Sequence, residues 1–107
     1  MADAVLGLLG IARRAGSLAL GSHAAEAALK AGRAKLLLLA SDLSERSRRT
    51  LSGMSEAREI PWRLLSCDMA ALSQAVGTGA GCLTVNDDGF AKKILSLLTA
   101  SKEECLL

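Results

Sequence analysis

The only histidine in the 107-residue chain, His23, follows Gly21 and Ser22 at the start of an alanine-rich segment. Ser22 is a typical N-cap residue, because its hydroxyl can accept a hydrogen bond from an amide of the first helical turn. Such a turn also has free N–H groups, which suit phosphate. His23 is therefore a candidate hydrogen-bonding group at an anion-binding helix end. The alternative is a polar residue that an exposed turn simply tolerates.

The other polar residues form no recognisable catalytic set. The chain contains no second histidine that could bind a metal together with His23. Asp87 and Asp88 are adjacent in the sequence, and the start of a helix is sufficient to explain them. Catalysis needs several convergent groups. We therefore expect no enzymatic activity, no catalytic residues, no metal and no cofactor.

A glycine-rich stretch, Gly77-Thr78-Gly79-Ala80-Gly81, separates a predicted helix from a predicted strand. A dinucleotide-binding loop follows a strand and opens a helix, so the order here is the reverse. Glycines in such a loop permit a sharp turn or the close approach of a ligand to the backbone. We interpret the stretch as a turn or a ligand-contact loop.

The distribution of charge and cysteine narrows the class of protein. Residues 13–49 contain eight basic and three acidic side chains, whereas residues 50–107 contain five basic and seven acidic ones. A basic first half is a modest indication of nucleic-acid binding, and an ordinary solvated surface is an equal alternative.

Three widely spaced cysteines are neither a metal motif nor a disulfide framework. No apolar run reaches the roughly 20 residues that span a bilayer, so we expect no membrane partner and a cytoplasmic location.

Hydrophobic periodicity predicts that helices and strands alternate along the chain. Helices are expected at residues 3–15, 22–31, 44–59, 69–76 and from 88 onward, and strands at residues 17–20, 35–40, 62–66 and 82–85. This alternation predicts one α/β domain, residues 1–100, in which helices cover both faces of a sheet. The run Leu36–Leu39 should be buried on both faces, and Gly32 should end the helix before it. Residues 101–107 should form a frayed C-terminal tail.

The segment from Gly21 through Lys30-Ala31-Gly32-Arg33-Ala34-Lys35-Leu36 to Leu39-Ala40-Ser41-Asp42 resembles the family of ribosomal proteins L-seven-Ae and L-thirty-e, which bind kink-turn RNA. Ile60-Pro61 and the stretches 71–77 and 85–91 follow in the family's order. Residues 9–16 look like the start of the bacterial YlxQ-type members. The resemblance covers roughly residues 4–98. It implies a three-layer α-β-α sandwich with a mixed four-stranded sheet, as in L-thirty-e.

In that family the helix turn after Gly21 and the loop before the last strand meet on one side and hold a bent RNA. The resemblance therefore implies RNA contacts from Gly21, Ser22, His23, Arg33, Lys35, Gly79, Ala80 and Gly81. Arg13 and Arg14 are candidate phosphate contacts, and a solvated helix end is the alternative for both.

The chain departs from the family at the turn that reads RNA. The family carries Asn, Glu and Lys there, and we assign His23, Ala24 and Glu26 to those positions. Ala24 and Glu26 are thus RNA-binding by family position only, because Ala24 lacks a polar group and Glu26 would repel phosphate.

Two expectations about function follow. The first is a non-enzymatic, monomeric RNA-binding protein whose partner is a structured, kink-turn-like RNA, with the ribosome as a further expected partner. The alternative is a protein–protein interaction scaffold of the same fold with an eroded RNA site.

Overall fold

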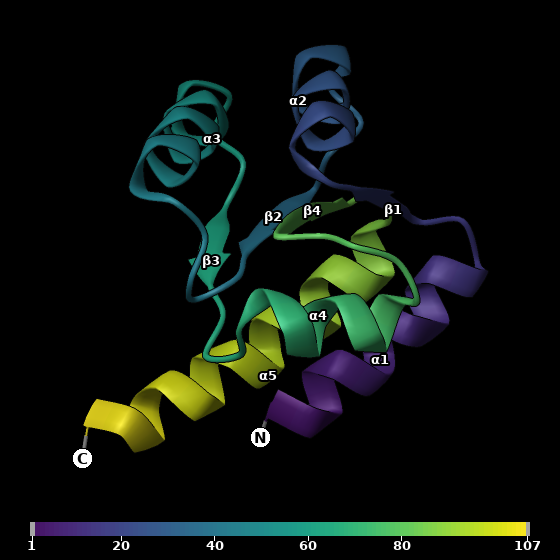
Figure 1. Cartoon of the computed structure of the whole chain (residues 1–107), viewed down its shortest axis with the longest axis vertical. Coiled ribbons are helices and arrows are strands. Elements are labelled where there is room, and N and C mark those ends of the chain that lie inside the picture. The colour runs from purple at the N-terminus through teal and green to yellow at the C-terminus, as the bar shows by residue number, and fades with distance from the viewer. Residues whose placement is uncertain (1, 107) are drawn as a thin grey trace.

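The computed structural model describes the backbone of residues 2–106 and the side chains of residues 4–98. Its elements alternate as the sequence predicts (Figure 1). In chain order they are α1 (Ala2–Arg14), β1 (Leu18–Leu20), α2 (Ser22–Ala31), β2 (Leu36–Leu39), α3 (Glu45–Ala57), β3 (Trp62–Leu64), α4 (Met69–Val76), β4 (Cys82–Val85) and α5 (Asp88–Leu106).

The four strands form one mixed sheet in the order β1-β4-β2-β3. Strand β4 pairs antiparallel with β1 and β2, and β2 pairs parallel with β3. In the central pair, Leu36 lies opposite Val85 and Leu39 lies opposite Cys82. The mixed four-stranded sheet implied by the resemblance is therefore confirmed.

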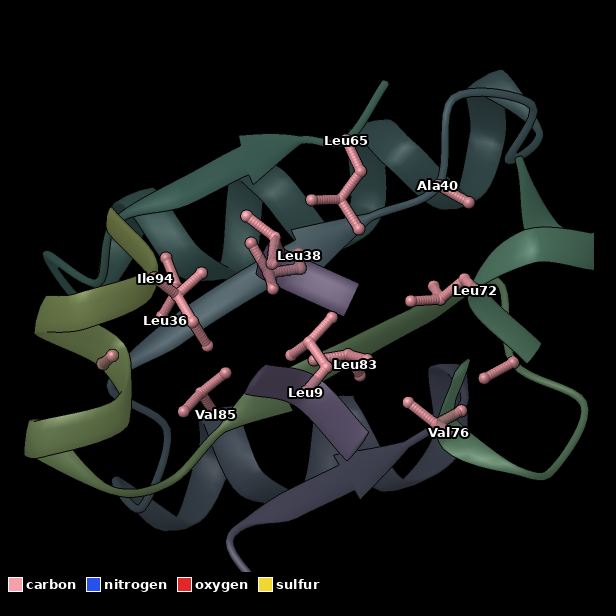
Figure 2. Packing of buried hydrophobic residues seen from close by; sticks show 13 residues of the cluster. Leu9, Leu36, Leu38, Ala40, Leu65, Leu72, Val76, Leu83, Val85 and Ile94 are labelled. Carbon is pink, nitrogen blue, oxygen red and sulfur yellow. The ribbon is translucent and has the colours of Figure 1, made fainter. Parts of the chain in front are cut away.

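Helices cover both faces of the sheet, with α2 and α3 on one side and α1, α4 and α5 on the other (Figure 1). Strand β2 supplies both cores, because alternate side chains point to opposite faces. Leu36 and Leu38 join the cluster under α1, α4 and α5, shown in Figure 2, whereas Leu37 and Leu39 join the cluster under α2 and α3. All four leucines are fully buried, as the absence of polar alternation predicted.

The sequence predicted the C-terminal end of α2 correctly, but not its N-terminal end. Gly32 ends the helix in the left-handed region, at φ 74°, and its N–H bonds back to the last helical carbonyls. Ser22 is not the N-cap that we expected. It is the first helical residue, and Gly21 takes the cap position at φ 89° and ψ 163° with no side chain capping the turn. The Gly21 amide donates to the Cys82 carbonyl at 2.9 Å, and this tertiary hydrogen bond fixes the helix start one residue earlier than predicted.

Three other helices begin at side-chain caps. Ser44 accepts the Ser47 amide at 3.3 Å, Asp68 accepts the Ala71 amide at 2.9 Å, and Asp87 accepts the Phe90 amide at 3.0 Å. These short polar side chains stand just before an apolar-periodic segment, which is the usual signature of a helix start.

Helix α5 is longer than the sequence indicated. Its backbone continues to Leu106, through residues that we expected to form a frayed tail. The side chains beyond Leu98 and all of Leu107 lie outside the described residues, so the frayed tail stays a prediction. In the described part of the chain, no helix has the length and apolar character needed to cross a bilayer.

Candidate nucleic-acid interface

A backbone hydrogen bond joins the start of α2 to the loop before β4. The N–H of Gly21 donates to the carbonyl of Cys82 at 2.9 Å. Gly21 follows the last residue of β1, and Cys82 is the first residue of β4. The first turn of α2 and the loop 77–81 therefore meet at one end of the sheet.

The first turn of α2 is open to solvent. Ser22 and His23 are exposed, Ala24 is half-buried, and among the described side chains none caps the turn. The first amides of a helix have no partner within it, and the helix dipole adds partial positive charge there. This turn can therefore receive a phosphate or carboxylate beside the His23 ring.

The three loop residues predicted to contact RNA, Gly79, Ala80 and Gly81, have different structural roles. The Ala80 amide donates to Ser73 Oγ at 2.9 Å, and the Ser73 hydroxyl donates to the Ala80 carbonyl at 3.3 Å. A Cβ on Gly81 would lie 2.7 Å from Met69 Sδ, so any side chain at this position would require the Met69 side chain to move. A Cβ on Gly79 would meet nothing within 4 Å. Among the three, Gly79 is the residue whose backbone a ligand can approach.

The two arginines at the end of α1 face different surroundings. Arg13 lies beside the start of the loop, with Cζ 3.9 Å from the position of a Cβ on Gly77. Arg14 lines a shallow hollow of about 350 Å³ with residues of α1 and with Ala75 of α4. The structure thus places Arg13, but not Arg14, next to the loop.

Arg33 and Lys35 lie away from this edge, contrary to the sequence expectation. The Lys35 amide donates to the carbonyl of Val85 at 2.8 Å, and Val85 is at the opposite end of β4 from Cys82. The chain enters α2 at one end of the sheet and leaves it at the other, about 15 Å further on for a ten-residue helix. The closeness of Arg33 and Lys35 to Gly21 in the sequence does not carry over to space.

Neither of the two described cysteines has the lowered pKa of a reactive thiol. Burial, followed by the nearby negative charge of Glu26, raises the pKa of the Cys82 thiol to about 11. Burial is also the main cause that raises the pKa of Cys67. A thiol with a raised pKa is protonated at neutral pH and reacts slowly. Among the residues with described side chains, no group of three His, Cys, Asp or Glu is placed to hold a metal.

A family model for the Ribosomal protein L7Ae/L30e/S12e/Gadd45 family matches residues 3–95. The chain belongs to this family. Two relatives match it over most of their length. It is 31% identical over 93 residues to "RNA-binding protein YlxQ" of Enterococcus faecium, covering 87% of this chain and 89% of the relative. It is 32% identical over 92 residues to the protein of the same name from Bacillus subtilis (strain 168), covering 85% and 91%.

Solved structures show the same fold as this L7Ae/L30e-family chain. A protein of unknown function from Bacillus halodurans C superposes with a TM-score of 0.83 and 28% identity, covering 89% of this chain and 96% of that one. The Giardia lamblia 15.5kD RNA binding protein superposes with a TM-score of 0.73, covering 95% and 86%. At 18% identity, the second likeness supports the fold alone.

One position assigned from the L7Ae/L30e family needs a correction. The family's turn has the order Gly-x-Asn-Glu-x-x-Lys, so from Gly21 the lysine falls on Ala27, one residue beyond Glu26. Ala27 is exposed, whereas Glu26 is half-buried and close enough to Cys82 to affect its thiol. The chain therefore lacks the family's lysine, but it does not present a carboxylate at that position.

The start of α3 is a basic segment at the same end of the sheet, which the sequence alone did not place there. Helix α3 begins after β2, at the end of the sheet where α2 also begins. Its first turns carry Arg46, Arg48 and Arg49, and Glu45 pairs with Arg48 at 3.6 Å and Arg49 at 2.9 Å. The cluster of arginines was visible in the sequence, but its position depends on the pairing of β2 with β4.

Proposed function

We propose that this chain is a non-enzymatic RNA-binding protein that recognises structured, kink-turn-like RNA. Family membership and two relatives named as RNA-binding proteins support the proposal. The observation that carries it is the Gly21–Cys82 hydrogen bond, because it holds an uncapped helix N-terminus at the point where the glycine-rich loop 77–81 enters β4.

The interface residues favour contact with the RNA backbone over readout of bases. The α2 amides and the Arg13 guanidinium suit phosphate, and such contacts position RNA without specifying its sequence. His23 can both donate and accept, so it can replace part of the family's asparagine contact. Ala24 cannot replace the glutamate contact. A good bidentate base contact contributes about 1–3 kcal/mol of discrimination, so kink-turn preference is weaker here than with the family's residues.

Several finer properties belong to the same proposal. The protein acts as a monomer in the cytoplasm, and its RNA partner is ribosomal, so it associates with the ribosome. Membership of a ribosomal-protein family supports the ribosomal partner. The proposal of no enzymatic activity rests on the interface chemistry, which contains one imidazole and, among the described residues, no cluster of His, Cys, Asp and Glu that could hold a metal.

An interaction scaffold is the second candidate function. The face of α2 that the family uses for RNA carries two alanines here, Ala24 and Ala27, and neither has a group that could bond a base. Small apolar side chains on an exposed turn suit contact with another protein as well as with RNA. An RNA-free pull-down that yields a stoichiometric protein partner would favour this alternative.

An amide-shift titration tests where RNA binds. We expect a kink-turn RNA to shift the backbone amides of Ser22, His23, Ala24 and Gly79 in the ¹⁵N-labelled protein. The exposed part of α5 near Lys92 should not shift, and it serves as the internal control. Shifts confined to α5, or no shifts at all, would contradict the proposed interface.

A further inference from the structure

A second basic surface lies at the end of the sheet opposite Gly21. There a hollow of about 380 Å³ opens between the C-terminal ends of α2 and α3. Its lining includes three cationic side chains, Lys30, Lys35 and Arg58, and one carboxylate, Glu59. We call it the basic hollow. Its cations outnumber its carboxylates by three to one, and the exposed Arg33 follows α2 at the same end.

The cations of the basic hollow have no carboxylate partner within the described residues. In that part of the chain, ion pairs involve only Arg48 and Arg49, both with Glu45 at the other end of α3. Arg58 makes a long side-chain bond of 3.4 Å to the Met54 carbonyl. The charges of Lys30 and Lys35 are thus available to a ligand.

Helix ends do not explain these cations fully. Carbonyl ends of helices attract positive charge, and both α2 and α3 end here. However, two of the four C-terminal carbonyls of α2 are already occupied, since the amides of Gly32 and Arg33 donate to Leu29 and Ala28. Each helix C-terminus carries a partial charge of about −0.5, so the three cations exceed the combined negative charge of the two helix ends and Glu59.

The backbone around the basic hollow is held in place. The buried Ser55 hydroxyl donates to the Ile60 carbonyl, and the Ile60 amide donates back to the Ser55 carbonyl at 2.9 Å. This turn forces Glu59 to φ 57°, the one positive φ at a non-glycine residue in the described chain. On the other side, the amide of Lys35 is anchored to Val85. The cations therefore project from a preformed frame, which reduces the entropy lost on binding.

We propose that the basic hollow binds backbone phosphates of the same RNA that the α2 N-terminus holds. This inference rests on the proposed function. The hollow lies about 15 Å from the α2 N-terminus, the length of that helix. An RNA strand covers this span in about four to five nucleotides at roughly 3.4 Å each. One RNA that leaves the first interface along α2 thus reaches Lys30 and Lys35.

The test compares two variants that each lose two exposed lysines. Lys30→Gln/Lys35→Gln changes the basic hollow, and Lys92→Gln/Lys93→Gln changes α5 as the matched control. Each protein is titrated at several salt concentrations with a kink-turn RNA whose stems extend well past the bend. For the hollow variant we expect weaker binding and a log K against log salt slope that is shallower by about 1.4–1.8, at roughly 0.7–0.9 per phosphate contact. The control should keep the wild-type slope.

A third variant, Glu59→Asn, should act in the opposite direction. RNA should bind several-fold more tightly, because the substitution removes the carboxylate of the hollow. The backbone should be unchanged, because asparagine tolerates positive φ. Equal changes in the hollow and control variants, or none in either, would overturn this inference while leaving the proposed function intact. Failure of the wild-type protein to bind the RNA would overturn both.

Discussion

The amide of Gly21 and the carbonyl of Cys82 are 2.9 Å apart, and this hydrogen bond couples α2 to the loop before β4. Glycine is needed at position 21 because the backbone there adopts φ 89° and ψ 163°, a conformation that residues with a side chain rarely adopt. A side chain at this residue would meet no steric obstacle, because an added Cβ has nothing within 4 Å. The requirement is conformational.

Gly21→Ala should therefore destabilise the protein by about 1–3 kcal/mol, the cost of a strained backbone conformation. It should also weaken RNA binding, because the start of α2 would shift relative to the loop. Urea unfolding measures the first effect and an RNA titration the second. A wild-type unfolding free energy in the variant would show that the φ value at Gly21 is not constrained.

Gly79 and Gly81 should respond differently to the same substitution. Gly81→Ala places a Cβ 2.7 Å from Met69 Sδ and 3.0 Å from Leu43 Cδ1, so both side chains must move, and we expect a loss of about 1 kcal/mol, the lower end of the cost of overpacking. Gly79→Ala meets open space, and we expect little change in stability but weaker RNA binding. Similar unfolding curves for the two variants would refute this assignment of roles.

Ala24→Glu should restore a base contact that the family uses. We expect preference for kink-turn RNA over a straight duplex to rise by roughly 5- to 150-fold, the equivalent of about 1–3 kcal/mol. Ala24→Gln is the matched control for size without charge. Parallel titrations of both RNAs measure the ratio, and an unchanged ratio in Ala24→Glu would contradict the assignment of position 24.

Arg13 and Arg14 provide a matched pair of charge deletions one residue apart. Arg13→Gln should reduce the salt slope of RNA binding by about 0.7–0.9, because Arg13 lies beside Gly77 and can reach phosphate. Arg14→Gln should leave the slope unchanged, because Arg14 lines the hollow between α1 and α4. The prediction fails if the two slopes change equally.

The Cys82 thiol should make stability depend on pH in alkaline solution. Its pKa is about 11 in the folded chain against an ordinary value of 9.0, chiefly through burial. Between these values the unfolded chain loses the proton and the folded chain keeps it, so the unfolding free energy falls as pH rises. Below pH 9 the stabilisation is complete. Cys82→Ala should remove this part of the fall, measured by denaturant unfolding from pH 8 to 11. Glu26→Gln should lower the pKa of Cys82, so the fall in the unfolding free energy should end at a lower pH.

Local signals predicted most of the fold. Gly32 ends α2 and the leucines of β2 are buried on both faces, as predicted, because each feature depends on residues within a few positions. Ser22 failed as a cap because a tertiary bond from Gly21 to Cys82 sets the helix start. No local pattern carries that information.

The candidate site was less predictable than the fold for the same reason. The sequence and the family resemblance indicated the α2 turn and the glycine loop, and strand pairing brings these together. Arg33 and Lys35 lie at the opposite end of the sheet from Gly21, because α2 spans the sheet between them. The arginines after Ser44 were missed because only the β2–β4 pairing brings α3 to this edge.

The most direct test of the central claim is a titration of the purified protein with a kink-turn RNA and with a straight duplex of matched length, at two salt concentrations. We predict salt-sensitive binding to both RNAs with a preference for the kink-turn. Equal affinity for the two would contradict kink-turn recognition and leave a general RNA-binding surface. No binding to either RNA would contradict the RNA function itself and favour the interaction scaffold.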